Sequence, residues 1–546
     1  MVSQGVDRSE SPAAGSAGSS SGILAEAQRR RSFAVISHPD AGKSTLTEAL
    51  ALHAQVIDSA GAVHGKSGRR GVTSDWMEME RQRGISVSSA VLQFSYRDAV
   101  INLLDTPGHG DFSEDTYRVL AAVDAAVMLL DAAKGLEPQT LKLFDVCRSR
   151  KIPVLTFVNK WDRPGREPLE LLDEVEQRIG LRPMPLTWPL GIAGELKGLI
   201  EVATGEYTKF TRAAGGATRA SAEVVAPEVV AADEPQFWST AQDEIALLEE
   251  IGAQFDEKEF LAGTATPVLF GAALSNIGVA RLLDALVDLA PPPSEREDAE
   301  GRPRALDTPL SGLIFKVQAG MDRAHRDRMA FLRINSGRFE RGMVLTHAAT
   351  GKPFATKYAQ AVFGNQRTTV EEAFPGDIVG LVNANALRPG DTLYASGPIE
   401  YPAIPSFAPE HFSVARCADA GKTKQFRKGI EQLDGEGVIQ VLRSDRRGDQ
   451  APVLAAVGPL QFDVVAARME SEFNAPIRLE GLPYQIARVT DEAGEAALSS
   501  QSECEVLTRS DGVKLAVFSN KWRMDVVIRK FPDVTFAPLL AGTVTD

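Results

Sequence analysis

The chain has few cysteines, no long apolar run and no excess of basic residues, and each absence excludes a class of protein. Its 3 cysteines, Cys147, Cys417 and Cys504, are odd in number and far apart, so we expect no disulfide framework and a reducing compartment, the cytoplasm. The stretch closest to membrane-spanning length, Leu120 to Leu130, is interrupted by Asp124, so we expect no membrane contact. The 59 Lys and Arg and 73 Asp and Glu residues give a net charge of −14, so any RNA contact must use local basic patches.

A phosphate-binding pattern follows a short apolar run, Phe33 to Ile36, which is typical of a buried strand. A loop of small residues comes next, and Gly42 and Lys43 open a helix. In this pattern the backbone N–H groups and the helix N-terminus face a polyphosphate, Lys43 reaches its outer phosphates, and the Ser44 hydroxyl ligates Mg²⁺. The first glycine of the usual pattern is Ser37 here. Alone, the pattern also fits an ordinary strand-to-helix turn.

A charged stretch, Ser74 to Ser86, has Gly84 near its end and is typical of a mobile surface loop. If the loop closes over a nucleotide, the Ser86 hydroxyl is a candidate second Mg²⁺ ligand. An exposed helix end explains the same residues equally well.

A second apolar run ends in a carboxylate at Asp105 and is followed by Thr106-Pro107-Gly108-His109. An acid at the carboxyl end of a buried strand is suited to holding Mg²⁺, directly or through water. Gly108 allows a backbone N–H group to approach the γ-phosphate because it carries no Cβ atom. His109 would then lie beside the attacking water and is the predicted catalytic residue.

A third strand, Val154 to Val158, leads into Asn159-Lys160-Trp161-Asp162. The Asp162 carboxylate can accept hydrogen bonds from both N1–H and the N2 amino group of guanine, and adenine offers no matching donors. Asn159 can bond the O6/N7 edge, and the Lys160 stem can lie along the ring. Ligands of parallel sheets bind at these carboxyl ends.

Three such motifs in order predict a GTP-binding domain with GTP or GDP and Mg²⁺ as ligands. The small residues after the apolar run at residues 267–270 could pack on the guanine. The predicted metal ligands are Ser44, Ser86 and Asp105, the last through water. The predicted GTP contacts are Ser37, His38, Pro39, Asp40, Ala41, Gly42, Lys43, Ser44, Asp105, Thr106, Pro107, Gly108, His109, Asn159, Lys160, Trp161, Asp162, Ala272, Ala273 and Leu274.

Composition and turn residues divide the chain around this domain. Residues 1–24 are rich in Ser, Gly and Ala and are expected to be disordered. The GTP-binding domain is assigned to residues 25–293, with an insertion at about 165–262 that includes a low-complexity loop at 213–234. Residues 294–308 are a predicted linker.

Short strands separated by turn signals predict a β-barrel at residues 309–400. Residues 401–546 are assigned to a third domain that reads as β-α-β-β-α-β, the split βαβ unit. Its basic residues either contact phosphates or form a solvated face; they are Lys422, Lys424, Arg427, Lys428, Arg443, Arg446 and Arg447.

The motifs resemble those of translational GTPases, and the longer stretches resemble the bacterial class II peptide chain release factors (release factor three). Asp105-Thr-Pro-Gly-His109 is the form found in translational GTPases. The resemblance runs from about residue 25 to the C-terminus, and the stretches that carry it are residues 36–43, 74–80, 82–86, 111–117 and 461–465.

This resemblance implies three domains: a GTPase domain, an elongation-factor-Tu-like barrel and a third α/β domain. It implies GTP hydrolysis on the ribosome that accompanies removal of the stop-codon-reading class I release factor after peptide release. The implied partners are class I release factors, ribosomal proteins and the sarcin–ricin loop of the large-subunit RNA, and the protein is expected to be a monomer. By the same resemblance, His109 is expected to be held off the phosphate in solution. On the ribosome it would swing in next to the sarcin–ricin loop, with Pro39 and Ile85 as its apolar neighbours.

The chain departs from the family pattern at three positions. Gly110 stands where an acid or another residue is usual, Trp161 where an aliphatic residue is usual, and Ala272 where a Ser or Thr is common. Ser86 replaces the Thr of the elongation factors and keeps a hydroxyl. The nearest alternative is an elongation factor G-like translocase or a ribosome-protection GTPase, which carry more domains after the barrel. A GTP-binding switch without meaningful hydrolysis and a P-loop ATPase or kinase are further alternatives.

Overall fold

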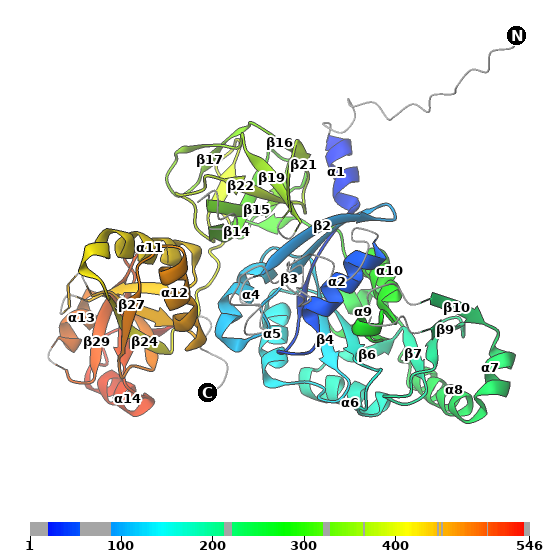
Figure 1. The fold of residues 1–546 in the computed structure, drawn as a ribbon. Coiled ribbons are helices and arrows are strands. Elements are labelled where there is room, and N and C mark those ends of the chain that lie inside the picture. The colour runs from blue at the N-terminus through cyan, green and yellow to red at the C-terminus, as the bar shows by residue number, and fades with distance from the viewer. Residues whose placement is uncertain are drawn as a thin grey trace, which may run out of the picture.

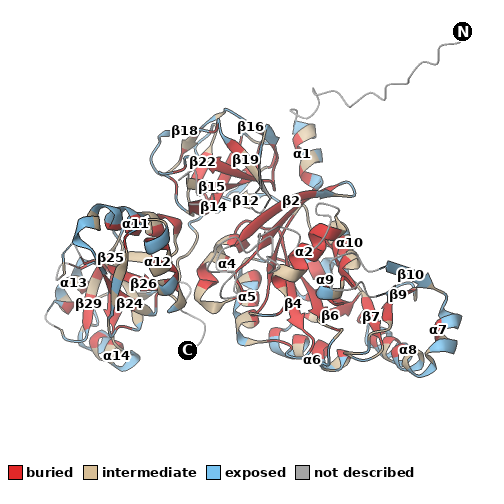
Figure 2. Ribbon diagram, viewed as in Figure 1, coloured by how far each residue is buried: buried red, intermediate tan, exposed pale blue. Residues whose placement is uncertain are grey.

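The structure is a computed structural model that describes residues 20–54, 89–211, 221–319, 328–363, 366–444, 447–448, 451–499 and 501–539. Three large sheets of seven or eight strands organise the described chain (Figure 1). They form the predicted α/β domain, barrel and α+β domain. Most of their strand residues are buried (Figure 2). Within the described ranges, no helix is long and apolar enough to cross a membrane.

The first sheet is mainly parallel and has the order β2-β3-β1-β4-β5-β11-β6, with only β2 antiparallel to its neighbour. Its central strands are nearly continuous apolar runs because both faces of the sheet are covered. The strands are β1 (Arg30–Ile36), β2 (Ala90–Tyr96), β3 (Ala99–Asp105), β4 (Ala125–Asp131), β5 (Val154–Asn159), β6 (Arg182–Pro185) and β11 (Ala265–Phe270).

Helices cover both faces of this sheet. Leu46 and Leu50 of α2 (Lys43–His53) share one core cluster with α10 (Val279–Leu289). The opposite cluster contains residues of three other helices, α4 (Ser113–Leu120), α5 (Pro138–Ser149) and α6 (Pro168–Ile179). The result is a doubly wound α/β domain, in which ligands bind at the carboxyl ends of the strands.

The segment between β5 and β11 adds a small antiparallel sheet of order β10-β9-β8-β7 with α7 and α8 at the side of the domain (Figure 1). Helix α9 instead packs on the main sheet through Phe260. The expectation of a loop at 213–234 was wrong for residues 221–233, which form β10 and α7. Residues of β10 are mostly exposed, so pairing with β9 forms the strand without an apolar pattern. The elements are β7 (Thr187–Leu190), β8 (Gly198–Glu201), β9 (Tyr207–Thr211), β10 (Ser221–Val225), α7 (Pro227–Asp233), α8 (Pro235–Glu250) and α9 (Glu257–Leu261).

The expectation of disorder for residues 1–24 was wrong at its end, because helix α1 spans Ser20–Gln28. Ile23 and Ala27 are buried, so two apolar side chains in this Ser- and Gly-rich segment are enough to hold the helix against the domain. Residues 1–19 lie outside the described ranges.

The second domain is an antiparallel sheet of order β18-β17-β23-β14-β15-β22-β19-β20, the predicted barrel. Before it, β12 (Arg296–Glu297) and β13 (Pro303–Arg304) pair within the predicted linker. The barrel strands are β14 (Ser311–Ala319), β15 (Arg328–Ser336), β17 (Val344–His347), β18 (Pro353–Ala355), β19 (Ala359–Phe363), β20 (Gln366–Thr369), β22 (Ile378–Val382) and β23 (Thr392–Tyr394), with β16 (Phe339–Glu340) and β21 (Glu372–Ala373) as a separate pair.

Buried ion pairs join the barrel to the first domain. Nη2 of Arg333 lies 2.8 and 2.7 Å from the two carboxylate oxygens of Asp124, and both side chains are almost fully buried. Arg296 also contacts Asp124, at 2.9 Å. Arg30 of β1 bonds Asp377 through two nitrogens. Because buried charges are costly unless paired, these contacts hold the two domains in one arrangement.

The third domain begins with the predicted β-α-β-β-α-β order, and the structure repeats that order once more. The sheet order β27-β24-β26-β25-β29-β30-β28-β31 is symmetric about the contact between β25 and β29. The first half is β24 (His411–Cys417), α11 (Thr423–Glu436), β25 (Gln440–Arg443), β26 (Val453–Ala456), α12 (Leu460–Ser471) and β27 (Ile477–Gly481). The second is β28 (Ile486–Thr490), α13 (Glu492–Leu498), β29 (Cys504–Arg509), β30 (Lys514–Phe518), α14 (Lys521–Lys530) and β31 (Ala537–Pro538).

Candidate nucleotide-binding site

Each predicted motif follows a strand of the first sheet. The strands β1, β3, β5 and β11 end at Ile36, Asp105, Asn159 and Phe270. These strands run in the same direction, so the loops that follow them gather at one edge of the sheet.

The loop between β1 and α2 is shaped by two residues with positive φ. Asp40 has φ 64° and Gly42 has φ 99°, which is strained for a side chain with a Cβ atom. A Cβ on Gly42 would lie 2.6 Å from Nδ2 of Asn159. Nζ of Lys43 donates to Oγ of Ser37 at 3.1 Å, and Ser37 Oγ donates to the His38 carbonyl. The serine that replaces the usual glycine therefore contacts the lysine that is predicted to bind phosphate.

The second motif lies directly against this loop. A Cβ on Gly108 would lie 2.6 Å from Nζ of Lys43 and 3.4 Å from Cα of Pro39. Asp105 is buried at the end of β3, and Thr106 Oγ1 donates to the Val35 carbonyl at 2.6 Å. The backbone at Gly108 thus lies beside the Lys43 ammonium, in a space that a Cβ atom would fill. The absence of a Cβ atom there fits the close approach of a phosphate group.

The amide of Asn159 connects the first and last loops. Its Nδ2 donates to the Ala41 carbonyl, and its Oδ1 accepts from the Ala273 N–H group, both at 2.8 Å. The side chain is buried. An amide nitrogen carries two hydrogens, so one donor of Nδ2 is still available to a base edge.

Lys160 has φ 67° and bonds the Asp40 carbonyl, so it also contacts the first loop. Its Nζ lies 2.8 Å from Oδ2 of Asp131 at the end of β4. Burial opposes ionisation of Asp131, but the hydrogen bonds from Lys160 and the Ala133 N–H group and the Lys160 charge together lower the pKa of the carboxyl. A charged pair therefore fixes the lysine stem between two loops.

Asp162 has a partner that the sequence analysis missed. Oγ of Ser275 donates to Oδ2 of Asp162 at 2.8 Å. The usual hydroxyl position holds Ala272, and Ser275 supplies a hydroxyl three residues later, a signal visible in the sequence. The Trp161 indole is fully buried and packs edge-on against Phe270. Only the backbone of Trp161 is left to face a nucleotide, and Leu274 is half exposed.

His38 lies on the inner side of the first loop and is almost fully buried. Its Nε2 is 2.7 Å from Oε2 of Glu137. Burial holds the pKa of His38 below its ordinary value, although the Glu137 carboxylate acts in the opposite direction. The sequence analysis did not find Glu137, which lies at the start of α5.

His109 follows Gly108 and caps a single turn, η1 (Gly110–Phe112). Its Nδ1 accepts from the Asp111 N–H group at 3.3 Å and lies 3.2 Å from Oδ1 of Asp111. The side chain is 40% exposed. Ser86 and Ile85, the predicted metal ligand and the predicted apolar neighbour, lie outside the described residues. Ser44 and Asp105 are in the described part, in the first turn of α2 and at the end of β3.

Of the basic candidates in the third domain, Lys424, Arg427, Lys428 and Arg443 are exposed. Arg447 instead bonds both oxygens of the buried Glu505 carboxylate at 2.6 Å, which gives it a structural contact. Arg446 is outside the described residues.

The three domains and the loop set define a GTPase of the translation-factor class. The family model "Elongation factor Tu GTP binding domain" matches residues 28–292, "Elongation factor G domain 2" matches 309–396, and "Class II release factor RF3, C-terminal domain" matches 401–528. Curated relatives named "Peptide chain release factor 3" agree. The one from Microcystis aeruginosa is 46% identical over 94% of this chain and 96% of its own length, and the one from Gloeothece citriformis is 46% identical over 94% and 97%. The chain therefore belongs to the peptide chain release factor 3 family.

A crystal structure of a protein from Thermus thermophilus has a TM-score of 0.66 and 22% identity, and the match covers 84% of this chain and 69% of that chain. This likeness concerns the fold alone.

Proposed function

We propose that this chain hydrolyses GTP to GDP and phosphate on the ribosome, and that this promotes dissociation of class I release factors after peptide release. The observation that carries the proposal is the combination of domains: a class II release factor C-terminal domain follows a GTPase domain and a barrel. The site residues predicted above are proposed as the GTP contacts, with Trp161 acting through its backbone.

The first and second loops are proposed to hold the triphosphate. Lys43 would pair with its outer oxygens and the Gly108 N–H group would approach the γ-phosphate. Ser44 and Asp105, with Ser86 as a further candidate, are proposed to hold Mg²⁺, which would neutralise charge on the phosphate oxygens. The position of the Lys43 ammonium beside the backbone at Gly108 supports this, because both would face the same phosphate group.

The third loop is proposed to select guanine. Asp162 would accept from the two donors of the base, and Ser275 would hold that carboxylate by donating to its Oδ2 atom. Asn159 already connects the phosphate loop to the base loop. Binding of the base would therefore be coupled to the geometry of the phosphate loop.

His109 is proposed to orient the water that attacks the γ-phosphorus. The new P–O bond forms as the bond to the β–γ bridging oxygen breaks, and the water proton ends on the released phosphate. This is mainly a matter of positioning, because phosphoryl transfer needs little covalent chemistry from the protein. The side chain adjoins Gly108 and is partly exposed, which supports access to such a water.

The deciding experiment follows GTP turnover and class I release-factor dissociation in one reaction, with and without ribosomes stalled at a stop codon. Ribosome-dependent turnover with faster dissociation is the expected result. Turnover without faster dissociation would favour a translocase or ribosome-protection GTPase. Equal turnover with and without ribosomes would refute the proposal.

His109→Ala tests the catalytic assignment separately. We expect GTP affinity to stay near that of the parent, while ribosome-stimulated hydrolysis falls by roughly 100-fold or more. Equal losses of binding and hydrolysis would mean that His109 has a structural role instead.

A further inference from the structure

The third domain meets the GTPase domain at the beginning of α12. Oδ2 of Asp111 accepts from the N–H group of Leu460, the first residue of α12, at 2.7 Å. The Asp111 side chain is only 14% exposed. A carboxylate at a helix N-terminus is favourable because it accepts a hydrogen bond from an N–H group that has no partner within the helix. Its negative charge is also attracted to the positive end of the helix dipole.

The end of α11 meets cationic side chains of both other domains. Nη1 of Arg118, from α4, donates to the carbonyl of Gly437 at 3.0 Å, and Nη2 of Arg328, from β15, donates to the carbonyl of Gly435 at 2.6 Å. These carbonyls belong to the last turn and cap of α11. An anion at one helix N-terminus and cations at another C-terminus hold the third domain by complementary charge.

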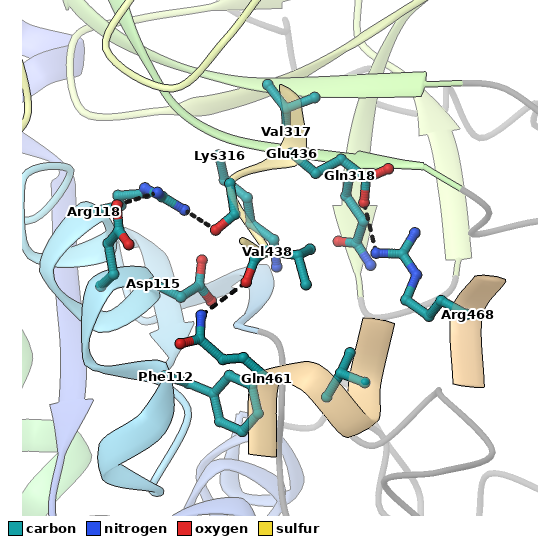
Figure 3. A pocket seen from close by; sticks show the side chains of 13 residues that line it. Phe112, Asp115, Arg118, Lys316, Val317, Gln318, Glu436, Val438, Gln461 and Arg468 are labelled. Carbon is teal, nitrogen blue, oxygen red and sulfur yellow. Dashed lines mark hydrogen bonds and ion pairs between the residues drawn. The ribbon is translucent and has the colours of Figure 1, made fainter. Parts of the chain in front are cut away.

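The contact at Asp111 is also sterically specific. A Cβ on Gly458 would lie 2.0 Å from Cγ of Asp111, so only glycine permits this approach. Phe112 packs against Val464 of α12 beside it. A cavity of about 70 Å³ adjoins these residues and is lined by side chains of all three domains (Figure 3). The Asp111 contact therefore lies beside a small apolar cluster and requires glycine at position 458.

The same aspartate contacts the proposed catalytic histidine. Its N–H group donates to Nδ1 of His109, and its Oδ1 lies 3.2 Å from that nitrogen. One carboxylate oxygen of Asp111 thus faces His109 while the other bonds the third domain. The contact with Leu460 joins residues 349 positions apart in the sequence.

We propose that Asp111 is a positioning residue that couples docking of the third domain to the position of His109. While α12 is docked, the bond from the Leu460 N–H group fixes the Asp111 side chain. The Asp111 N–H group then holds the imidazole in its capping position over η1 by donating to Nδ1 of His109. When the third domain moves away, Asp111 loses the Leu460 N–H group, the turn is released, and His109 can reach the water. This inference rests on the proposed role of His109 in hydrolysis.

Gly458→Ala is the sharpest test, because the substitution lies in the third domain. It displaces the Asp111 side chain and leaves the sequence of the GTPase domain unchanged. Its matched control is Gly481→Ala in the same domain, where a Cβ would meet nothing within 4 Å. The measurement is single-turnover GTP hydrolysis by the full chain without ribosomes. We expect Gly458→Ala to accelerate it roughly tenfold, the effect of losing one hydrogen bond to a charged group, and Gly481→Ala to match the parent.

Two further variants separate positioning from a general loss of structure. Asp111→Ala should accelerate hydrolysis similarly, and adding Gly458→Ala to it should have no further effect, because the clashing carboxylate is gone. Adding His109→Ala to Gly458→Ala should abolish the acceleration. GDP affinity should stay within twofold of the parent in Gly458→Ala.

The inference is overturned if both Gly458→Ala and Asp111→Ala hydrolyse GTP at the parent rate, or if the acceleration persists without His109. Either result would leave the proposed function standing, since that function is tested by ribosome-stimulated turnover and factor dissociation. Conversely, loss of ribosome stimulation in the parent chain would refute the proposed function even if Gly458→Ala accelerates hydrolysis through His109.

Discussion

Asn159→Ala tests whether one buried amide controls nucleotide affinity by connecting two loops. The substitution removes the donor to the Ala41 carbonyl and the acceptor for the Ala273 N–H group, both at 2.8 Å. Asn159 is 2% exposed, so water cannot readily replace either partner. Two backbone groups that shape the phosphate and base loops would lose their partner.

The size of the effect follows from these two bonds. A buried hydrogen bond contributes about 0.5–1.5 kcal/mol net, and leaving its partner unsatisfied costs about 1–3 kcal/mol. For two such groups, with partial relaxation, we expect about 2–4 kcal/mol in total. If about 2 kcal/mol of this appears in binding, GDP affinity falls roughly 30-fold.

The assay is equilibrium titration with a fluorescent GDP analogue, together with thermal unfolding. Thr156→Val is the matched control, because Thr156 lies on the same strand and its Oγ1 contacts Thr266 Oγ1 at 2.9 Å, away from the nucleotide loops. The control should lower thermal stability and leave GDP affinity unchanged. If Asn159→Ala binds GDP within threefold of the parent, the reasoning about the loop connection is refuted.

Three shorter predictions concern the base, a thiol and a domain contact. Asp162→Asn should weaken GTP binding and favour xanthosine triphosphate, measured as the ratio of the two affinities; unchanged GTP affinity would contradict the base assignment. Burial raises the pKa of the Cys147 thiol from 9.0 to about 12, so the folded chain favours the neutral thiol. The stability that the neutral thiol contributes is complete below pH 9 and is lost as the pH rises towards about 12. At about pH 8, near the ordinary thiol pKa, a thiol reagent should therefore label the partly exposed Cys417 first and Cys147 only on unfolding. Mass spectrometry of the labelled chain measures this order. Rapid labelling of Cys147 in the native chain would contradict the prediction. Asp124→Asn should lower stability by about 3–5 kcal/mol, because the almost fully buried Arg333 loses its counter-charge; a loss below about 1 kcal/mol in urea unfolding would mean that this pair contributes little.

The fold class was predictable because its signals are local. Buried parallel strands require apolar runs such as Val154 to Val158, and a loop that approaches phosphate requires residues without bulk, such as Gly42 and Gly108. The first half of the third domain was predictable for the same reason, since its strands and helices leave local patterns. These patterns are set within about ten residues of the chain.

The second half of the third domain was not predicted. Its strands β28 and β31 are short, and much of their surface is only partly buried, so neither shows the alternation that a half-buried strand needs. The symmetric sheet exists because β29 pairs with β25 across the two halves. That pairing depends on the whole domain and leaves no local pattern.

The candidate site divides in the same way. The sequence by itself determined the three loops, the guanine-type Asn159 and Asp162, and the His109 position, because backbone shape and side-chain chemistry there are fixed by neighbours in the chain. Only the tertiary structure decided that Asn159 connects two loops, that Ser275 holds Asp162, and that Asp111 contacts α12. Those contacts join residues 113 to 349 positions apart, and the burial that makes them strong arises only when the loops and domains pack together.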